Sequence, residues 1–161
     1  MSTSFRPTAS APASAPAQTP AASRGIDPRG PQFAASITVV VLVAILLLPA
    51  PAAAVLTAVQ AALFGIGAVR GVQHTPHSWL FRTLVRPRLG APTEWEDPAP
   101  PRFAQAVGLG FTVVALVGYL AGVTVLGQIA IGFALVAALL NAVFRFCLGC
   151  EVYLLLKRAT A

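Results

Sequence analysis

The residues of this chain best suited to chemistry are its only two cysteines, Cys147 and Cys150, which form a Cys-x-x-Cys sequence. Two thiols at this spacing can close a reversible disulfide or present two thiolates to a metal ion. Because structural disulfides are disfavoured in the cytoplasm, a cytoplasmic pair of this kind is expected to serve redox or metal chemistry. In the alternative interpretation, both cysteines are small apolar residues that pack between helices.

The reactivity of the pair depends on whether a helix runs through it. In an unbroken helix that continues through Glu151, both thiols lie near a helix C-terminus and beside a carboxylate, which disfavours the thiolate. If the helix breaks at Gly149, a second helix begins near Cys150 and its positive end favours the thiolate. Arg145 is then expected to act as a further thiolate stabiliser. The sequence leaves both arrangements open.

A second pair of metal-ligand residues stands earlier in the chain. His74 and His77 precede Cys147 and Cys150 by seventy-three positions. Two imidazoles and two thiolates would complete a tetrahedral zinc site with ordinary ligand types. In the alternative interpretation, the histidines are polar loop residues at a membrane surface. Zinc is therefore expected only if the two pairs meet in space.

These residues lie at the ends of long apolar segments. The chain has 161 residues, of which 57% are hydrophobic and 10% are charged, whereas soluble domains carry about 25% charged residues. Residues 30–69 and 103–144 contain no Asp, Glu, Lys, Arg or His. Each block of about 40 residues would span about 60 Å as helix, twice a hydrocarbon core of about 30 Å. The sequence therefore predicts an all-α membrane protein with four transmembrane helices in two hairpins.

Breaks near the middle of each block divide it into two spans. Pro49 and Pro51 interrupt the first block, because proline lacks the backbone N–H that a helix needs, and a softer break follows Ala121 in the second. The predicted helices are 33–49, 53–70, 104–121 and 128–147, within a membrane domain at 25–158 that has a central loop at 71–103. Residues 1–24 consist mostly of Ala, Pro, Ser and Thr, which predicts a disordered tail.

The basic residues predict an orientation in the membrane. All eleven Lys and Arg lie before, between or after the two blocks, and both hairpin tips lack charge. Because positively charged segments stay on the cytoplasmic side, we expect both termini and the central loop in the cytoplasm, and the protein in the cell (inner) membrane. The net charge of +6 flanks the apolar blocks, so the expected partner is the lipid bilayer and not nucleic acid.

The two hairpins share a sequence. Residues 27–34, DPRGPQFA, recur seventy positions later as DPAPPRFA at 97–104. This repeat predicts two hairpins related by an axis along the membrane normal. Residues 37–54 alone also resemble a signal peptide, whose cleavage would leave three helices. The repeat gives the first helix a structural counterpart and so favours its retention.

The central loop contains an amphipathic segment. On a helix, Trp79, Phe81 and Leu84 contribute to an apolar side, while Arg82 and Arg86 align one turn apart. A tryptophan at the level of the lipid headgroups and arginines toward anionic lipid are typical of an interfacial helix. We therefore expect a short interfacial helix here; the alternative is an irregular basic loop.

Three segments resemble a known family. They are LFRTLVRPRLG at 80–90, EDPAPPRFAQAVGL at 96–109 and FCLGCEVYLLLKR at 146–158, and they resemble domain-of-unknown-function family 4395, small integral membrane proteins common in actinobacteria. The resemblance implies four membrane helices and no established activity. Members are often encoded near thioredoxin-like and sulfurtransferase proteins, which implies thiol or sulfur handling and points to Cys147 and Cys150 here.

These features predict a cytoplasm-facing thiol redox or sulfur relay that uses Cys147 and Cys150. A thioredoxin-like or sulfurtransferase partner would dock on the basic central loop. The alternative hypothesis is a non-enzymatic membrane subunit or scaffold of a larger complex. A transporter is less favoured, since no charge inside the apolar blocks marks a pathway. The sequence leaves open whether the protein is an enzyme, what its oligomeric state is, and whether a quinone takes part.

Overall fold

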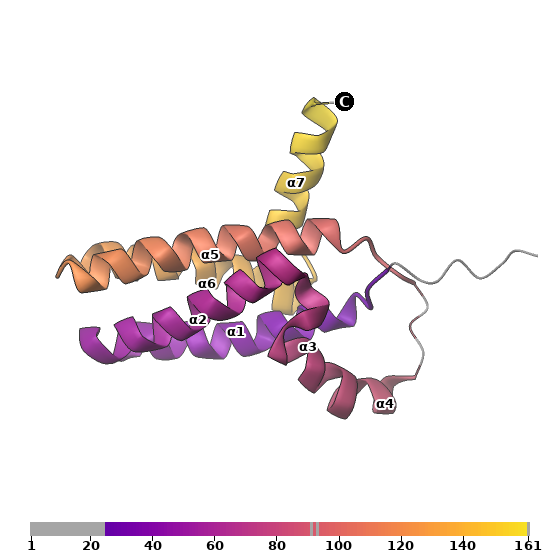
Figure 1. The fold of residues 1–161 in the computed structure, drawn as a ribbon, viewed down its shortest axis with the longest axis horizontal. Helices are drawn as coiled ribbons and strands as arrows, with labels where there is room; N and C mark the ends of the chain where they lie inside the picture. The colour runs from indigo at the N-terminus through magenta and orange to yellow at the C-terminus, as the bar shows by residue number, and fades with distance from the viewer. Residues whose placement is uncertain (1–24, 91, 93, 161) are drawn as a thin grey trace, which may run out of the picture.

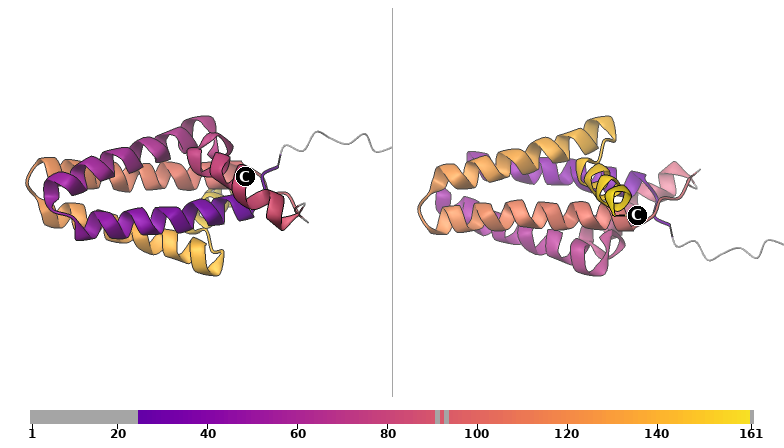
Figure 2. Two further views of the ribbon diagram at one scale, coloured as in Figure 1. Left: turned by 90° about the horizontal axis from the view of Figure 1, so that it is seen from below. Right: turned by 90° about the horizontal axis from the view of Figure 1, so that it is seen from above.

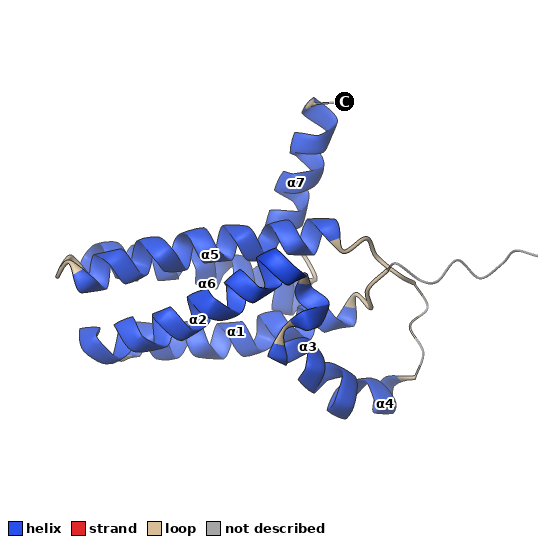
Figure 3. Ribbon diagram, in the orientation of Figure 1, coloured by secondary structure: helices blue, strands red, loops and turns tan. Residues whose placement is uncertain are grey.

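A computed structural model describes residues 25–90, 92 and 94–160. All the named secondary-structure elements in these residues are helices (Figure 3). Four helices are long and apolar enough to cross a membrane: α1 (Arg29–Leu47), α2 (Ala50–Arg70), α5 (Ala99–Leu120) and α6 (Thr124–Phe144). They confirm the predicted all-α fold with four membrane-spanning helices in two hairpins.

Shorter elements follow each hairpin. After α2 come a 3₁₀ turn (Val72–His74), α3 (Pro76–Leu80), a π-helical turn (Phe81–Val85) and α4 (Arg86–Leu89); after α6 comes α7 (Leu148–Ala159). The run from α3 to α4 confirms the predicted short helix between the hairpins. The α3–α4 run and α7 leave the same end of the bundle on opposite sides (Figure 1).

The four membrane helices begin three to five residues before the predicted positions. In α1, α2 and α5 the extra residues contain Pro31, Pro51 and Pro101, which a first helical turn tolerates because its N–H groups have no partner within the helix. At its other end α6 stops at Phe144, before the predicted 147, because Arg145 adopts the left-handed conformation (φ 56°, ψ 22°).

The two hairpins form two layers (Figure 2). Between the hairpins, the first helix of each packs against the second helix of the other, α1 against α6 and α5 against α2. Within the second hairpin, the close approach of α5 to α6 depends on glycine. A Cβ on Gly118 of α5 would lie 2.8 Å from the backbone nitrogen of Gly127 of α6. The outward side chains are mostly apolar, for example Val40, Val117 and Phe133, which are 69%, 57% and 61% exposed. Such a surface suits lipid and not water.

The segments that precede the two hairpins pair with each other. Ile26 and Glu96 exchange two backbone hydrogen bonds, of 2.9 and 3.0 Å. Asp27 and Asp97, each one residue further on, accept a hydrogen bond from the backbone N–H two residues ahead, at 3.0 and 2.9 Å. These residues are seventy positions apart in each case. The contacts therefore follow the sequence repeat and place its two copies around one axis.

The repeat continues into the bundle. The Gln32 side chain of α1 donates a hydrogen bond of 3.0 Å to the carbonyl of Ala142 near the end of α6. The Arg102 side chain, at the same place in α5, donates one of 2.7 Å to the carbonyl of Val69 near the end of α2. Each hairpin thus holds the last turn of the other, as a twofold arrangement requires.

The elements after the hairpins also correspond. Phe33 of α1 contacts Phe81 of the π-helical turn, with ring centroids 5.7 Å apart. Phe103 of α5 contacts Tyr153 of α7 at the same centroid distance, 5.7 Å. One aromatic pair therefore anchors the α3–α4 run to its hairpin, and an equivalent pair anchors α7. The repeating unit is a hairpin followed by an amphipathic helix.

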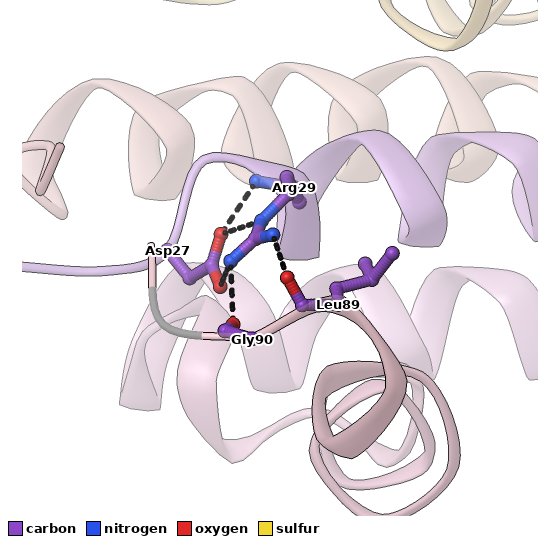
Figure 4. Close-up of polar contacts among 4 residues, drawn as sticks. All are labelled: Asp27, Arg29, Leu89 and Gly90. Atoms are coloured by element: carbon purple, nitrogen blue, oxygen red, sulfur yellow. Dashed lines mark hydrogen bonds and ion pairs between the residues drawn. The ribbon is translucent and has the colours of Figure 1, made fainter. Parts of the chain in front are cut away.

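A polar contact fixes the end of α4 (Figure 4). Arg29 pairs with Asp27 at 3.0 Å and donates to the backbone carbonyls of Leu89 and Gly90 at 3.3 and 3.2 Å. Partial burial raises the pKa of the Asp27 carboxyl, but the hydrogen bonds and the charge of Arg29 outweigh this, so the pKa lies below the ordinary 3.8.

We expect this contact to loosen in acid. Because the folded-state pKa of Asp27 is depressed, the carboxylate stabilises the fold above about pH 4. That contribution is lost as the pH falls through the lower folded value. Hydrogen exchange of residues 86–90, corrected for intrinsic rates, should therefore accelerate below about pH 4. Asp27→Asn should remove this pH dependence and Asp97→Asn should keep it; equal behaviour of the two variants would contradict the assignment.

Candidate thiol site at one end of the bundle

The chain breaks between α6 and α7 at Arg145. Its N–H donates to the carbonyl of Asn141 at 3.1 Å, and the N–H of Phe146 donates to the carbonyl of Leu140 at 3.2 Å. The bond from Arg145 to Asn141 is that of the αL motif, which satisfies a carbonyl at a helix end and usually places glycine at the left-handed position. Arg145 is the one non-glycine residue with positive φ in the described ranges. The backbone of Arg145 ends α6, and the role of its side chain as a thiolate stabiliser stays a prediction.

Cys147 is the N-cap of α7. Its Sγ accepts a hydrogen bond of 3.3 Å from the backbone N–H of Cys150. The two cysteines form a disulfide, with their Cα atoms 5.2 Å apart. Of the two arrangements that the sequence left open, the broken helix is therefore observed, with the break at Arg145 instead of Gly149. Both sulfurs lie at the positive end of a helix, where a thiolate is favoured when the pair is reduced.

Gly149 allows the start of α7 to lie directly against α5. A Cβ at Gly149 would lie 2.7 Å from both the Cα and the Cβ of Ala104. Only glycine allows this approach, and Gly149 is accordingly buried, while both cysteines are half-buried. The Cys-x-x-Cys loop is therefore held against the bundle and does not hang from it as a flexible terminus.

The two histidines do not join the cysteines. His74 is exposed, and its Nδ1 lies 2.7 Å from the carbonyl oxygen of Arg70. His77 is half-buried in the first turn of α3, where burial lowers its pKa from the ordinary value. No group of three or more His, Cys, Asp or Glu in the described part of the chain could hold a metal ion. The four predicted zinc ligands are thus not assembled into one site there.

The structural counterparts of the cysteines are hydroxyl residues. Thr75 is the N-cap of α3 and accepts a hydrogen bond of 3.3 Å from the N–H of Ser78. The bond from Cys150 to Cys147 has the same length and the same place at the start of the following amphipathic helix. The sequence comparison paired the cysteines with histidines because it used an offset of seventy-three. The structure pairs them with Thr75 and Ser78, at an offset of seventy-two.

An apolar cavity of about 230 Å³ adjoins the site. Its lining is formed by α1, α2, α5 and α6 together with the start of α7, and it includes Cys147. The disulfide thus borders the interior of the bundle on one side. On the other side α7 leaves the bundle (Figure 1).

Comparison with known proteins identifies a family for this chain. Residues 26–158 match the family model described as Domain of unknown function (DUF4395). Neither the curated proteins nor the solved structures include a match to the chain. The matched residues contain both hairpins, the α3–α4 run, the Cys-x-x-Cys loop and nearly all of α7. This chain therefore belongs to the DUF4395 family.

Proposed function

We propose that this membrane protein exchanges thiols and disulfides at Cys147 and Cys150, on the cytoplasmic face, with a soluble thioredoxin-like dithiol protein. One observation carries the proposal: the two sulfurs are joined at the N-cap of α7 in a loop held against the bundle. The counterpart turn at Thr75 and Ser78 has the same hydrogen bond without sulfur. The fold therefore does not need cysteine at this turn, which favours a chemical role over a purely structural one.

The exchange follows from the arrangement of the two sulfurs. A thiolate of the partner attacks Cys147 Sγ, the Cys147–Cys150 bond breaks, and Cys150 leaves as a thiolate that takes up a proton. The second thiol of the partner loses its proton and attacks the partner sulfur of the mixed disulfide. Cys147 then leaves as a thiolate at the positive end of α7, where it is stabilised. Two electrons have passed from the partner to the cysteine pair.

The charges around the pair support a cytoplasmic orientation. Arg82, Arg86 and Arg88 lie in the α3–α4 run, and Lys157 and Arg158 lie in the last turn of α7. All of these elements emerge from one end of the bundle (Figure 1). Basic residues at one end of membrane helices favour the cytoplasmic side. The same residues offer a positively charged surface on which an acidic partner would dock.

The proposal is tested by labelling and trapping. We expect an impermeant maleimide to label the reduced pair in inside-out vesicles and not in intact cells. Wild-type protein in the disulfide form should accumulate a mixed disulfide through Cys147 with a thioredoxin-like protein whose second cysteine is replaced by serine, because the thiol that resolves the mixed disulfide is then gone. Cys147→Ser is the matched control and should trap much less. Thiols that stay reduced and unreactive until denaturation, with no trapped partner, would refute the proposal.

A further inference from the structure

The residues that line the cavity beside the disulfide extend along the bundle. At one end the cavity is lined by Cys147 and Asn141, and further along α6 by Phe133. Phe133 and Asn141 are eight residues apart, which corresponds to about 12 Å of helix. The cavity thus runs from the thiol site toward the middle of the membrane-spanning part.

The two ends of the cavity differ in chemistry. Asn141 of α6 and Gln105 of α5, whose side chain lies against Gly67 of α2, both line the cavity, and each carries a side-chain amide that is a hydrogen-bond donor and acceptor. At the deeper end, the rings of Phe111 and Phe133 stack, with centroids 6.1 Å apart and planes 25° apart. No Asp, Glu, Lys, Arg or His of the described residues lines the cavity. An occupant that matches this lining has an uncharged polar head and an apolar tail.

The deeper end opens toward lipid. Phe133 and Val136 line the cavity and are 61% and 55% exposed on the outer surface of α6. In a bilayer these side chains face the hydrocarbon core, so an apolar molecule dissolved in the membrane reaches the cavity sideways. The head of that molecule then lies beside Cys147, at the other end.

We propose that this cavity binds a membrane quinone, and that the quinone accepts electrons from the reduced Cys147–Cys150 pair. A quinone head is flat and uncharged and carries two carbonyl oxygens that accept hydrogen bonds from amides such as Asn141 and Gln105. Its tail is apolar. A cavity of about 150 Å³ already holds benzene, so about 230 Å³ holds a substituted ring. A phospholipid headgroup, by contrast, would bring charges that the lining does not neutralise.

The redox step balances without a further reactant. The two thiols lose two electrons and two protons, and the Cys147–Cys150 disulfide forms. The quinone takes both electrons and both protons on its two oxygens and leaves as the hydroquinone. This inference rests on the proposed thiol exchange, by which the soluble dithiol reduces the pair again. Electrons then pass from the soluble partner through the two cysteines to the membrane pool.

The experiment uses the full-length protein in nanodiscs, reduced and freed of reductant under anaerobic conditions. The probe is a benzoquinone with every ring position substituted and a short alkyl tail, so that thiols cannot add to its ring. Quinone absorbance is followed by stopped flow, and free thiols are counted after acid quenching. We expect hydroquinone to form in an amount equal to the protein, with loss of both thiols. Absence of quinone reduction would overturn the quinone site.

Cavity variants show whether the reaction takes place in the cavity. Ala137→Phe adds a ring to the lining and should slow quinone reduction at least about tenfold. Val136→Trp should cover the opening with the same result, and it serves if Ala137→Phe does not fold. Leu139→Phe, outside the lining on the same helix, should keep the wild-type rate. Equal rates in all variants would overturn the site, as would a co-purified phospholipid that the quinone cannot displace.

The two proposals fail in different ways. Exchange with a small soluble disulfide should proceed at the same rate in wild type, Ala137→Phe and Leu139→Phe, because the loop at Cys147 is unchanged. If this exchange is normal and no quinone is reduced, the quinone site is wrong and the thiol exchange stands. If neither reaction occurs with the reduced protein, the proposed function itself is wrong, and the quinone site with it.

Discussion

The double substitution Cys147→Thr with Cys150→Ser should abolish thiol exchange and leave the fold intact. The substitutions give the second repeat the residue types of Thr75 and Ser78. In the first repeat, these two residues form the same capping hydrogen bond, also of 3.3 Å. We therefore expect the variant to unfold at the temperature of the reduced wild-type protein. Inside-out vesicles that contain it should no longer oxidise a soluble dithiol protein, whereas wild-type vesicles should do so.

The matched control is Cys147→Ala. Alanine cannot accept the hydrogen bond at the N-cap, so this variant should lose about 1 kcal/mol relative to the reduced wild type in addition to losing activity. Chemical denaturation monitored by circular dichroism compares the three proteins. If vesicles with the double variant oxidise the dithiol as fast as wild type, the cysteines serve only packing. The protein would then be better described as a membrane subunit or scaffold.

The fold follows closely from the sequence because lipid leaves few alternatives. A block of about 40 residues without charge must cross the hydrocarbon core twice, since backbone polar groups in lipid have to be satisfied within helices. The Asp-Pro repeat at 27–34 and 97–104 also indicated a relation between the hairpins, and Ile26 and Glu96, at equivalent positions before the two copies, bond to each other. The starts of α1, α2 and α5 were less accurate, because a first turn accepts proline that elsewhere ends a helix.

The candidate site was harder to predict, for reasons of backbone geometry. A left-handed helix end is usually marked by glycine, but here Arg145 adopts it, so the break before Cys147 left no sequence signal. The sequence did not indicate that Thr75 and Cys147 are equivalent, because a hydroxyl and a thiol residue differ in type. Both side chains nevertheless accept the N-cap hydrogen bond of the helix that follows. The zinc hypothesis assumed that the two pairs meet. The twofold arrangement instead places α3 against α1 and α7 against α5.

Substitution of Gly149 should give the largest loss of structure at the site. Any Cβ there would lie 2.7 Å from the Cα and the Cβ of Ala104, closer than carbon atoms approach without repulsion. The nearest atoms belong to helix α5 itself and cannot rotate away. Gly149→Ala should therefore separate the start of α7 from α5 and cost about 1–3 kcal/mol. Gly149→Val should cost more, because its branched side chain needs more space.

The control is Gly110→Ala on α5, where an added Cβ would meet no atom within 4 Å. It should be neutral or slightly stabilising, since alanine favours a helix interior. Hydrogen exchange of residues 146–158 measures the effect: fast exchange is expected in Gly149→Ala and wild-type protection in Gly110→Ala. Ala104→Gly should rescue Gly149→Ala only in part, because it removes one of the two close atoms.

Wild-type protection in Gly149→Ala would mean that the loop is not held against α5. The cysteines would then belong to a mobile terminus, and proximity to the cavity would no longer explain their chemistry.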